Sequence, residues 1–148
     1  NKKHKLFPFS TLTRIADKEA YLKSGLLGSI TAISLDTGQI VWQIPAGTYV
    51  VNDSKTIVGS LSYGGIAYAN LENNENISFF TGSHDKKIYA INNKDGKYIW
   101  SGDLPASGSG IPLVHKTSTE IWIFAVATGG RIPNDQSDSI VAFKQKLN

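Results

Sequence analysis

Two stretches of the chain share one pattern, and that pattern decides the fold. Residues 32–42 read AISLDTGQIVW, and residues 90–100 read AINNKDGKYIW. Ala, Gly and Trp occupy positions 1, 7 and 11 of both windows, which start 58 residues apart. A repeat of this length indicates one supersecondary unit that is used more than once, as in β-propellers.

Each window has the pattern of a β-hairpin. Residues rich in β-branched and aromatic side chains flank Asp36-Thr37-Gly38 in the first window and residues 93–96 in the second. Glycine supplies the positive φ that a tight corner needs, and an Asp side chain can bond the turn backbone. We therefore expect paired strands over 29–35 and 39–44, and again over 86–92 and 97–102.

Further strand patterns complete the repeat. Two precede the second hairpin and three follow it, over residues 66–70, 77–82, 111–114, 120–127 and 139–143. The second repeat then has four strands, and Ala142 stands where Ala32 and Ala90 stand in the earlier copies. We predict an all-β chain whose residues 29–148 form four-stranded antiparallel β-propeller blades. About two to three blades make an incomplete propeller, because a ring needs at least four.

The first 28 residues are less regular than the rest. A short helix is expected over residues 13–23, with Thr13 as its N-cap and Gly25 just past its end. We treat residues 1–28 as an irregular N-terminal segment.

Composition narrows the class of protein. Hydrophobic residues make up 41% and charged residues 18%, which suits a packed core. The net charge of +3 includes lysines near both ends, so we expect no nucleic-acid partner. The chain has no Cys, which excludes disulfides and thiolate metal sites. The longest strongly apolar stretch, residues 121–127, is far too short for a membrane span.

The eleven-residue window resembles the tryptophan-docking motif of quinoproteins, A-x-D-x-x-T-G-x-x-x-W. Ser34 and Asn92 stand at the Asp position, while Thr37 matches the Thr. The blocks that follow are similar in order to the C-terminal end of PQQ-dependent dehydrogenases of the membrane-bound glucose dehydrogenase type. Those blocks are 60–65, 81–90, 103–106, 111–113, 127–130 and 138–143.

The resemblance implies a function for the parent protein, meaning the longer protein of which this chain would be a part. It implies a periplasmic enzyme that oxidises a glucose-like sugar or an alcohol, with PQQ and calcium as cofactors and a quinone as electron acceptor. It also implies membrane association through an N-terminal part that this sequence does not include. Most ligands and the catalytic Asp of that family belong to other blades, so this segment is expected to be mainly structural. The alternative is a non-enzymatic PQQ-like propeller that serves as a binding or scaffold module of the cell envelope.

Several polar residues are candidates for a chemical role. His84 and Asp85 could form a His-Asp pair in which the carboxylate orients the imidazole as a general base. A polar turn between two strands explains these residues better. His4 and His115 are too scattered for metal-ligand spacing. Asp36 and Asp95 occupy turn positions in different repeats rather than one catalytic pair.

Three further features have a structural interpretation. Residues 134–138 are rich in oxygen but lack an EF-hand pattern. Residues 106–110 are rich in Gly and Ser but precede a strand, which argues against a phosphate cradle. Trp122 lies in an apolar run that predicts a buried central strand, so its ring is expected in the core.

We therefore expect no catalytic residue and no metal ligand in this chain, and assign no cofactor-binding residue. The expected functional residues are structural and belong to the docking motif: Ala32, Gly38, Trp42, Ala90, Gly96 and Trp100. The expected partners are the remaining propeller blades or another copy of the chain, with a small-molecule substrate bound by the parent protein.

Overall fold

A computed structural model describes residues 26–50, 56–62, 64–71, 76–130 and 134–147. The helix predicted over residues 13–23 lies outside these ranges. In the part of the chain that is described, no helix is long and apolar enough to cross a membrane.

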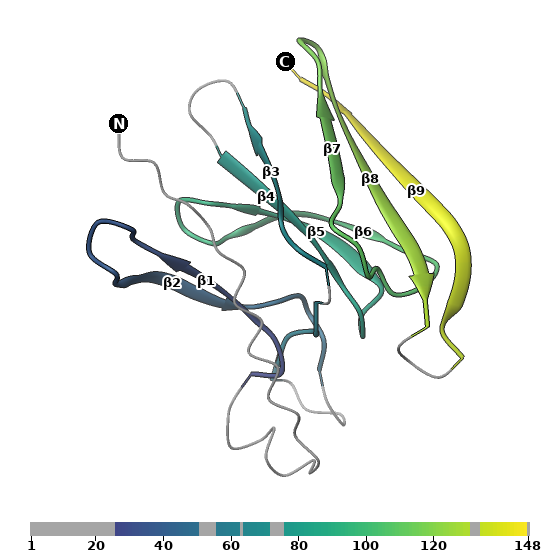
Figure 1. The fold of residues 1–148 in the computed structure, drawn as a ribbon, viewed down its shortest axis with the longest axis horizontal. Coiled ribbons are helices and arrows are strands. Elements are labelled where there is room, and N and C mark those ends of the chain that lie inside the picture. The colour runs from purple at the N-terminus through teal and green to yellow at the C-terminus, as the bar shows by residue number, and fades with distance from the viewer. Residues whose placement is uncertain (1–25, 51–55, 63, 72–75, 131–133, 148) are drawn as a thin grey trace.

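The described residues form nine strands in three antiparallel sheets (Figure 1). The first sheet pairs β1 (Ser29–Ile33) with β2 (Ile40–Pro45). The second has the order β3 (Ala67–Asn70), β4 (Asn76–Gly82), β5 (Lys87–Asn92) and β6 (Tyr98–Asp103). The third has the order β7 (Leu113–Lys116), β8 (Glu120–Gly129) and β9 (Gln136–Lys146).

The all-β prediction and the order of the strands are confirmed. Strands of the first two sheets lie within two residues of the expected bounds, and the third sheet departs most. β7 begins at Leu113, two residues later than predicted, because Pro112 has no N–H to donate to a ladder. β9 extends beyond residues 139–143 at both ends. It pairs with β8 from Gln136, opposite Gly129, to Lys146, opposite Glu120.

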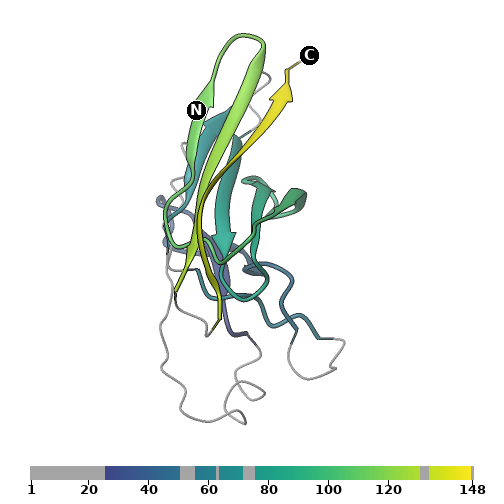
Figure 2. The same cartoon turned by 90° about the vertical axis from the view of Figure 1, so that its right-hand side faces the viewer.

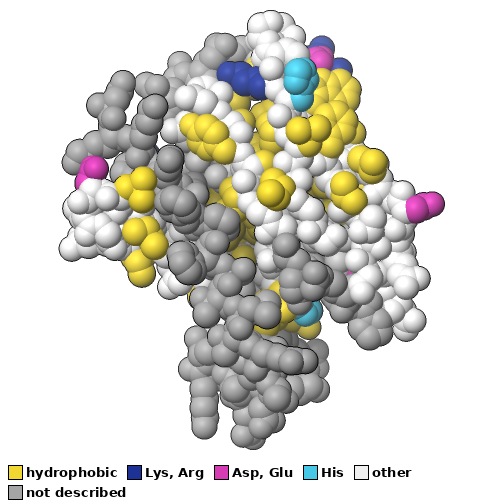
Figure 3. All heavy atoms as spheres, viewed as in Figure 1, with side chains coloured by type: hydrophobic (Ala, Val, Ile, Leu, Met, Phe, Trp, Pro, Cys, Tyr) yellow, Lys and Arg dark blue, Asp and Glu magenta, His cyan; other side chains and the backbone are white. Residues whose placement is uncertain are grey.

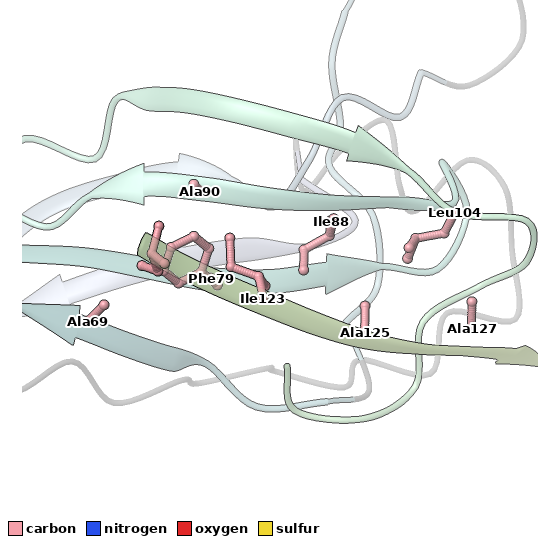
Figure 4. Close-up of a cluster of buried hydrophobic side chains, with 9 residues drawn as sticks. Ala69, Phe79, Ile88, Ala90, Leu104, Ile123, Ala125 and Ala127 are labelled. Atoms are coloured by element: carbon pink, nitrogen blue, oxygen red, sulfur yellow. The ribbon is translucent and has the colours of Figure 1, made fainter. Parts of the chain in front are cut away.

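The three sheets pack through two separate hydrophobic cores. The core between the first and second sheets contains Ile30, Ala46, Phe80, Tyr89 and Ile91. The core between the second and third sheets contains Ala69, Phe79, Ile88, Ala90, Leu104, Ile121, Ile123, Ala125 and Ala127 (Figure 4). Each large aliphatic or aromatic side chain that is buried there contributes about 1.5–3 kcal/mol. The second sheet is thus covered on both faces, which explains why neighbouring residues of β4 and β5 are buried alike.

The structure corrects the position predicted for Trp122. β8 is the central strand of its sheet, as predicted, but its side chains alternate between two faces. Ile121 and Ile123 face the core, so Trp122 between them lies on the opposite face and is only half-buried. Its ring stacks on Phe124, with centroids 6.2 Å apart, and Lys144 Nζ lies 4.9 Å from the ring centroid.

Candidate functional site

The indole of Trp42 contacts the next sheet. Its Nε1 donates a hydrogen bond of 3.1 Å to the carbonyl oxygen of Asn93, in the turn between β5 and β6. The ring lies against Gly96 of the same turn, where an added Cβ would come within 2.9 Å of the Trp42 Cε3 atom. Gly96 has φ of +72°, so this position requires glycine for its backbone as well as for the approach of the indole. The tryptophan of one repeat therefore sits on the turn of the next.

The two hairpins that carry the motif have the same local geometry. In each, the motif alanine lies opposite the motif tryptophan across the strand pair. The register shifts directly after Ala32 and Ala90. The glycine N–H donates to the backbone oxygen four residues earlier, Gly38 to Ser34 and Gly96 to Asn92. The side chain of the residue before each glycine accepts from the backbone two positions on, through the Thr37 hydroxyl and the Asp95 carboxylate.

Trp100 makes a different contact. Its ring meets Phe143 of β9 edge-on, with centroids 4.9 Å apart, and packs at the margin of the second core. An added Cβ at Gly102 would come within 2.7 Å of both rings. Trp100 therefore joins the second and third sheets through aromatic packing at this edge of the core.

A polar cluster around Asp85 lies where the loop after β2 meets the turn between β4 and β5. Asp85 Oδ2 accepts hydrogen bonds from the Tyr89 hydroxyl at 2.6 Å and from Thr48 N at 3.0 Å. The Tyr98 hydroxyl accepts from Gly47 N at 2.6 Å and donates to the Pro45 carbonyl at 2.5 Å. Burial raises the pKa of Tyr98 to about 12, and burial, reinforced by the bond to Asp85, raises the pKa of Tyr89 further. Both phenols therefore stay protonated and hold the loop.

His84 does not form a catalytic pair with Asp85. Its Nδ1 is buried without a hydrogen-bond partner, and its ring lies 4.8 Å from that of Tyr49. Burial lowers the pKa of His84, and the charge of Asp85 opposes this only in part. The backbone N–H of His84 donates to Ser60 Oγ at 2.8 Å, so the residue serves the packing of the turn.

A second polar cluster surrounds Asp135, which is only 2% exposed. Asp135 Oδ2 accepts from Ser107 N at 3.1 Å and from the Ser107 hydroxyl, which also lies 2.7 Å from the Ser83 carbonyl. Lys86 Nζ lies 3.0 Å from Asp135 Oδ1. Burial acts to raise the pKa of Asp135, but the Ser107 hydrogen bonds and the Lys86 ammonium outweigh it and hold that pKa below its usual value.

The two carboxylates make the same kind of contact. Asp85, in the turn after β4, holds the loop that follows β2, and Asp135, in the turn after β8, holds the loop that follows β6. Both loops carry a Pro-Ala pair shortly after the motif tryptophan, at residues 45–46 and 105–106. The contacts of Ser107, Lys86 and Asp135 were not predicted from the sequence, although the repeated Pro-Ala pair was a signal that the two loops are equivalent.

The other candidates from the sequence lie apart from one another. His115 is an exposed residue of β7, opposite Trp122. Asp36 and Asp95 lie in the turns of different sheets. In the loop of residues 106–110, an added Cβ at Gly108 would come within 2.5 Å of Thr81, so the loop packs directly on β4. His4 lies outside the described residues.

A calcium site needs several oxygen ligands close together. Among the described residues no group of three or more His, Cys, Asp or Glu side chains is placed to hold a metal ion. The Asp135 carboxylate is buried and is bound by Ser107 and Lys86. Asp85 Oδ2 is bound by Thr48 and Tyr89, whereas Asp85 Oδ1 is buried without a hydrogen-bond partner. We therefore assign no cofactor ligand to this part of the chain.

Comparisons with known proteins give the context of this architecture. Residues 4–122 match the family described as PQQ, glucose/ethanol/alcohol dehydrogenase, beta-propeller domain. The probable quinate dehydrogenase (quinone) of Xanthomonas campestris pv. juglandis is 30% identical over 78% of this chain and 15% of its own length. The quinate/shikimate dehydrogenase (quinone) of Acinetobacter baylyi is 28% identical, and the quinoprotein glucose dehydrogenase of Gluconobacter oxydans is 30% identical, with the same coverage.

The chain spans about 15% of the length of these relatives. The family match nevertheless covers most of the chain and includes both docking windows. The contact of Trp42 with Gly96 and the three antiparallel sheets agree with it. This chain belongs to the β-propeller domain family of PQQ-dependent glucose, ethanol and alcohol dehydrogenases.

Proposed function

We propose that this chain is a structural part of a quinone-linked PQQ dehydrogenase that oxidises a sugar or an alcohol. The observation that carries the proposal is the family match over residues 4–122, together with relatives named as quinoprotein or quinone-dependent dehydrogenases. In the parent protein, PQQ would accept two electrons from the substrate and pass them to a quinone. The substrate is a small molecule, and the other partners are the remaining blades of the propeller.

In this proposal, the residues of this chain hold neighbouring blades and their loops together. Trp42 docks the first blade on the second, and Trp100 packs against the third. Asp85 and Asp135 hold the loops at the end of the blades where β4 and β8 finish. A rigid loop end supports precise placement of groups that other blades supply. Calcium, a periplasmic location and membrane association through an N-terminal part belong to the same proposal and rest on the family resemblance.

The test uses the protein at the length that its gene encodes, loaded with PQQ and Ca²⁺. Reduction of a soluble quinone is measured with glucose, glycerol and quinate as separate substrates. We expect turnover with one of these classes and its loss after the metal is chelated. If properly folded protein binds no PQQ and reduces no quinone with any of them, the proposal is wrong and the scaffold alternative gains support.

A further inference from the structure

Two neighbouring residues in the turn between β4 and β5 each carry a buried polar atom without a partner. Among the described residues, no group forms a hydrogen bond with His84 Nδ1 or with Asp85 Oδ1, and both atoms are closed off from solvent. Buried polar atoms in folded proteins are nearly always hydrogen-bonded, so an exception points to strain or to function. The pair is therefore a candidate for a role beyond the packing of the turn.

Both residues hold the loop that follows β2. The ring of His84 lies 4.8 Å from that of Tyr49, and Asp85 Oδ2 accepts a hydrogen bond of 3.0 Å from Thr48 N. The approach is close, because a Cβ added at Gly47 would overlap Asp85 Oδ2. Figures 1 and 2 show this loop and the turn after β4 together at the lower end of the sheets. The contacts of one turn thus fix the position of the loop.

His84 is the group at this junction whose charge changes nearest to neutral pH. A histidine side chain ordinarily gains its proton between about pH 8 and about pH 5. Burial lowers the pKa of His84, and the negative charge of Asp85 opposes this only in part. The phenols of Tyr89 and Tyr98 stay protonated, because burial raises the pKa of each. Among the described residues, the charged or titratable side chains at the junction are those of Tyr49, His84, Asp85, Lys86, Tyr89 and Tyr98.

Protonation of His84 changes what its ring requires. Both ring nitrogens of an imidazolium are donors, and a buried positive N–H without an acceptor is unfavourable. The ring can gain an acceptor by drawing the Asp85 carboxylate toward Nδ1, which takes that carboxylate from Thr48. It can also turn out into water, which removes the ring from Tyr49. In either case the loop after β2 loses one of the contacts that hold it.

The equivalent junction between the second and third sheets is built differently. Asp135 occupies the place of Asp85 and binds Ser107 N in the loop after β6. The residue before it is Asn134, whose amide does not titrate, and Lys86 Nζ lies 3.0 Å from Asp135 Oδ1. Both carboxylate oxygens of Asp135 thus have partners. Of the two junctions that the structure describes, the first alone combines an unpartnered imidazole with an unpartnered carboxylate oxygen.

We propose that the contact between His84 and the loop after β2 is a pH-sensitive connection between the first and second sheets. Protonation of the imidazole releases the loop, whereas the junction around Asp135 stays closed over the same pH range. The pKa of His84 in the folded protein lies below the ordinary value of 6.5, so the closed junction binds the proton less well than the released one. The stability of the closed junction is therefore fully present above about pH 6.5 and is lost as the pH falls toward the lower pKa of the folded state. The proposal concerns contacts within this chain and does not depend on the proposed function.

Hydrogen exchange of two backbone amides compares the junctions within one molecule. Thr48 N–H donates to Asp85 and Ser107 N–H donates to Asp135, so each amide reports the opening of its own junction. Peptides that cover the two loops are followed by mass spectrometry in the protein at its encoded length, at about pH 7.5 and about pH 5.5. Each rate is divided by the intrinsic rate of an unfolded chain at that pH. We expect protection of the Thr48 loop to fall about threefold to tenfold at the lower pH, and that of the Ser107 loop to change by less than about twofold.

Two substitutions of His84 separate its titration from its packing. His84→Phe keeps an aromatic ring beside Tyr49 but cannot gain a proton, and His84→Gln removes the ring as well. Both variants should lose the pH dependence of loop protection. The matched control is His115→Gln, because His115 is an exposed residue of β7, and Figure 3 shows the histidine side chains of that face well apart. This control should keep the full pH dependence.

Two results would overturn the proposal. The first is unchanged protection of the Thr48 loop at the lower pH in the unmodified protein. The second is the same loss in His84→Phe or His84→Gln as in the unmodified protein, because another group would then be responsible. Circular dichroism and the melting temperature establish that each variant folds, and if one fails to fold, the other still decides. The readout needs no turnover, so a negative result leaves the proposed function untouched.

Discussion

At the scale of single residues, two glycines in equivalent turns share a backbone conformation but differ in their surroundings. Gly38 and Gly96 have φ of +70° and +72°, so both occupy the left-handed region. An added Cβ at Gly38 meets no atom within 4 Å, whereas at Gly96 it meets the ring of Trp42. The pair therefore separates the cost of backbone strain from the cost of displacing the docked indole.

We expect Gly38→Ala to destabilise the protein by about 1 kcal/mol, because a side chain is strained at positive φ. Gly96→Ala has the same strain and also pushes Trp42 from its place, which adds about 1–2 kcal/mol. Urea unfolding monitored by tryptophan fluorescence measures both. Equal losses in the two variants would show that the Trp42 contact does not stabilise the fold.

The strongest electrostatic prediction concerns the effect of Asp135 on the free energy of unfolding. Its pKa in the folded protein lies below the usual value, so its stabilising contribution is fully present above that usual value and is lost as the pH falls through the folded pKa. Asp135→Asn should lower the free energy of unfolding by about 2 kcal/mol at neutral pH, because hydrogen bonds to a charged group are lost. Below about pH 4 the difference from the unmodified protein should shrink.

The control for this variant is an exposed carboxylate. Asp103 forms an ion pair with Lys87 but its side chain is 85% exposed. Surface pairs of this kind contribute about 0–1 kcal/mol, so Asp103→Asn should change stability little. The free energy of unfolding of both variants is measured from neutral pH into the acid range. If Asp135→Asn loses no more of it than Asp103→Asn at any pH, the structural role of Asp135 is contradicted.

At the scale of elements, β8 shows how alternation decides which side chains carry an interface. Ala125 and Ala127 are both 0% exposed on the face toward the second sheet. Their small size lets the two sheets approach closely, and Ile121 and Ile123 fill the space further along. The apolar run of β8 alone did not reveal which face would be buried, which is why Trp122 was wrongly placed in the core.

Enlarging a side chain at this interface should therefore be costly. Ala125→Leu adds three carbon atoms to a closely packed site and should destabilise the protein by about 1–3 kcal/mol. Ser101→Leu, on an exposed position of β6, adds similar bulk and should change stability by less than about 0.5 kcal/mol. Thermal unfolding of the two variants compares them, and a tolerated Ala125→Leu would mean that the sheets do not pack closely there.

At the scale of the whole molecule, the described residues form the contacts between three antiparallel sheets. Asp135 is bound by Ser107 and Lys86, and Asp85 Oδ2 by Thr48 and Tyr89. Among the described residues, no group of three or more His, Cys, Asp or Glu side chains is placed to hold a metal ion. The proposed function places the chemistry of the longer protein in its other blades and gives this part of the chain a supporting role.

The 148-residue chain by itself should consequently show no dehydrogenase activity with added PQQ and Ca²⁺. Quinone reduction with glucose, glycerol and quinate is the measurement, alongside the protein at its encoded length as the positive reference. Clear turnover by the short chain would mean that its own residues hold the cofactor, and the structural assignment would then be wrong.

The sequence by itself determined the all-β class, the order of the strands and the two hairpins with their glycine turns. These features depend on local patterns, namely alternation, turn residues and a repeat of Ala, Gly and Trp at fixed spacing. The resemblance that this repeat carries was enough to indicate the family.

Only the tertiary structure decided which groups meet across the repeats. The bond from Trp42 to Asn93 joins residues 51 positions apart, and Asp135 meets Ser107 across 28 positions. Burial and pairing of this kind depend on the packing of one sheet on another, which no local pattern contains.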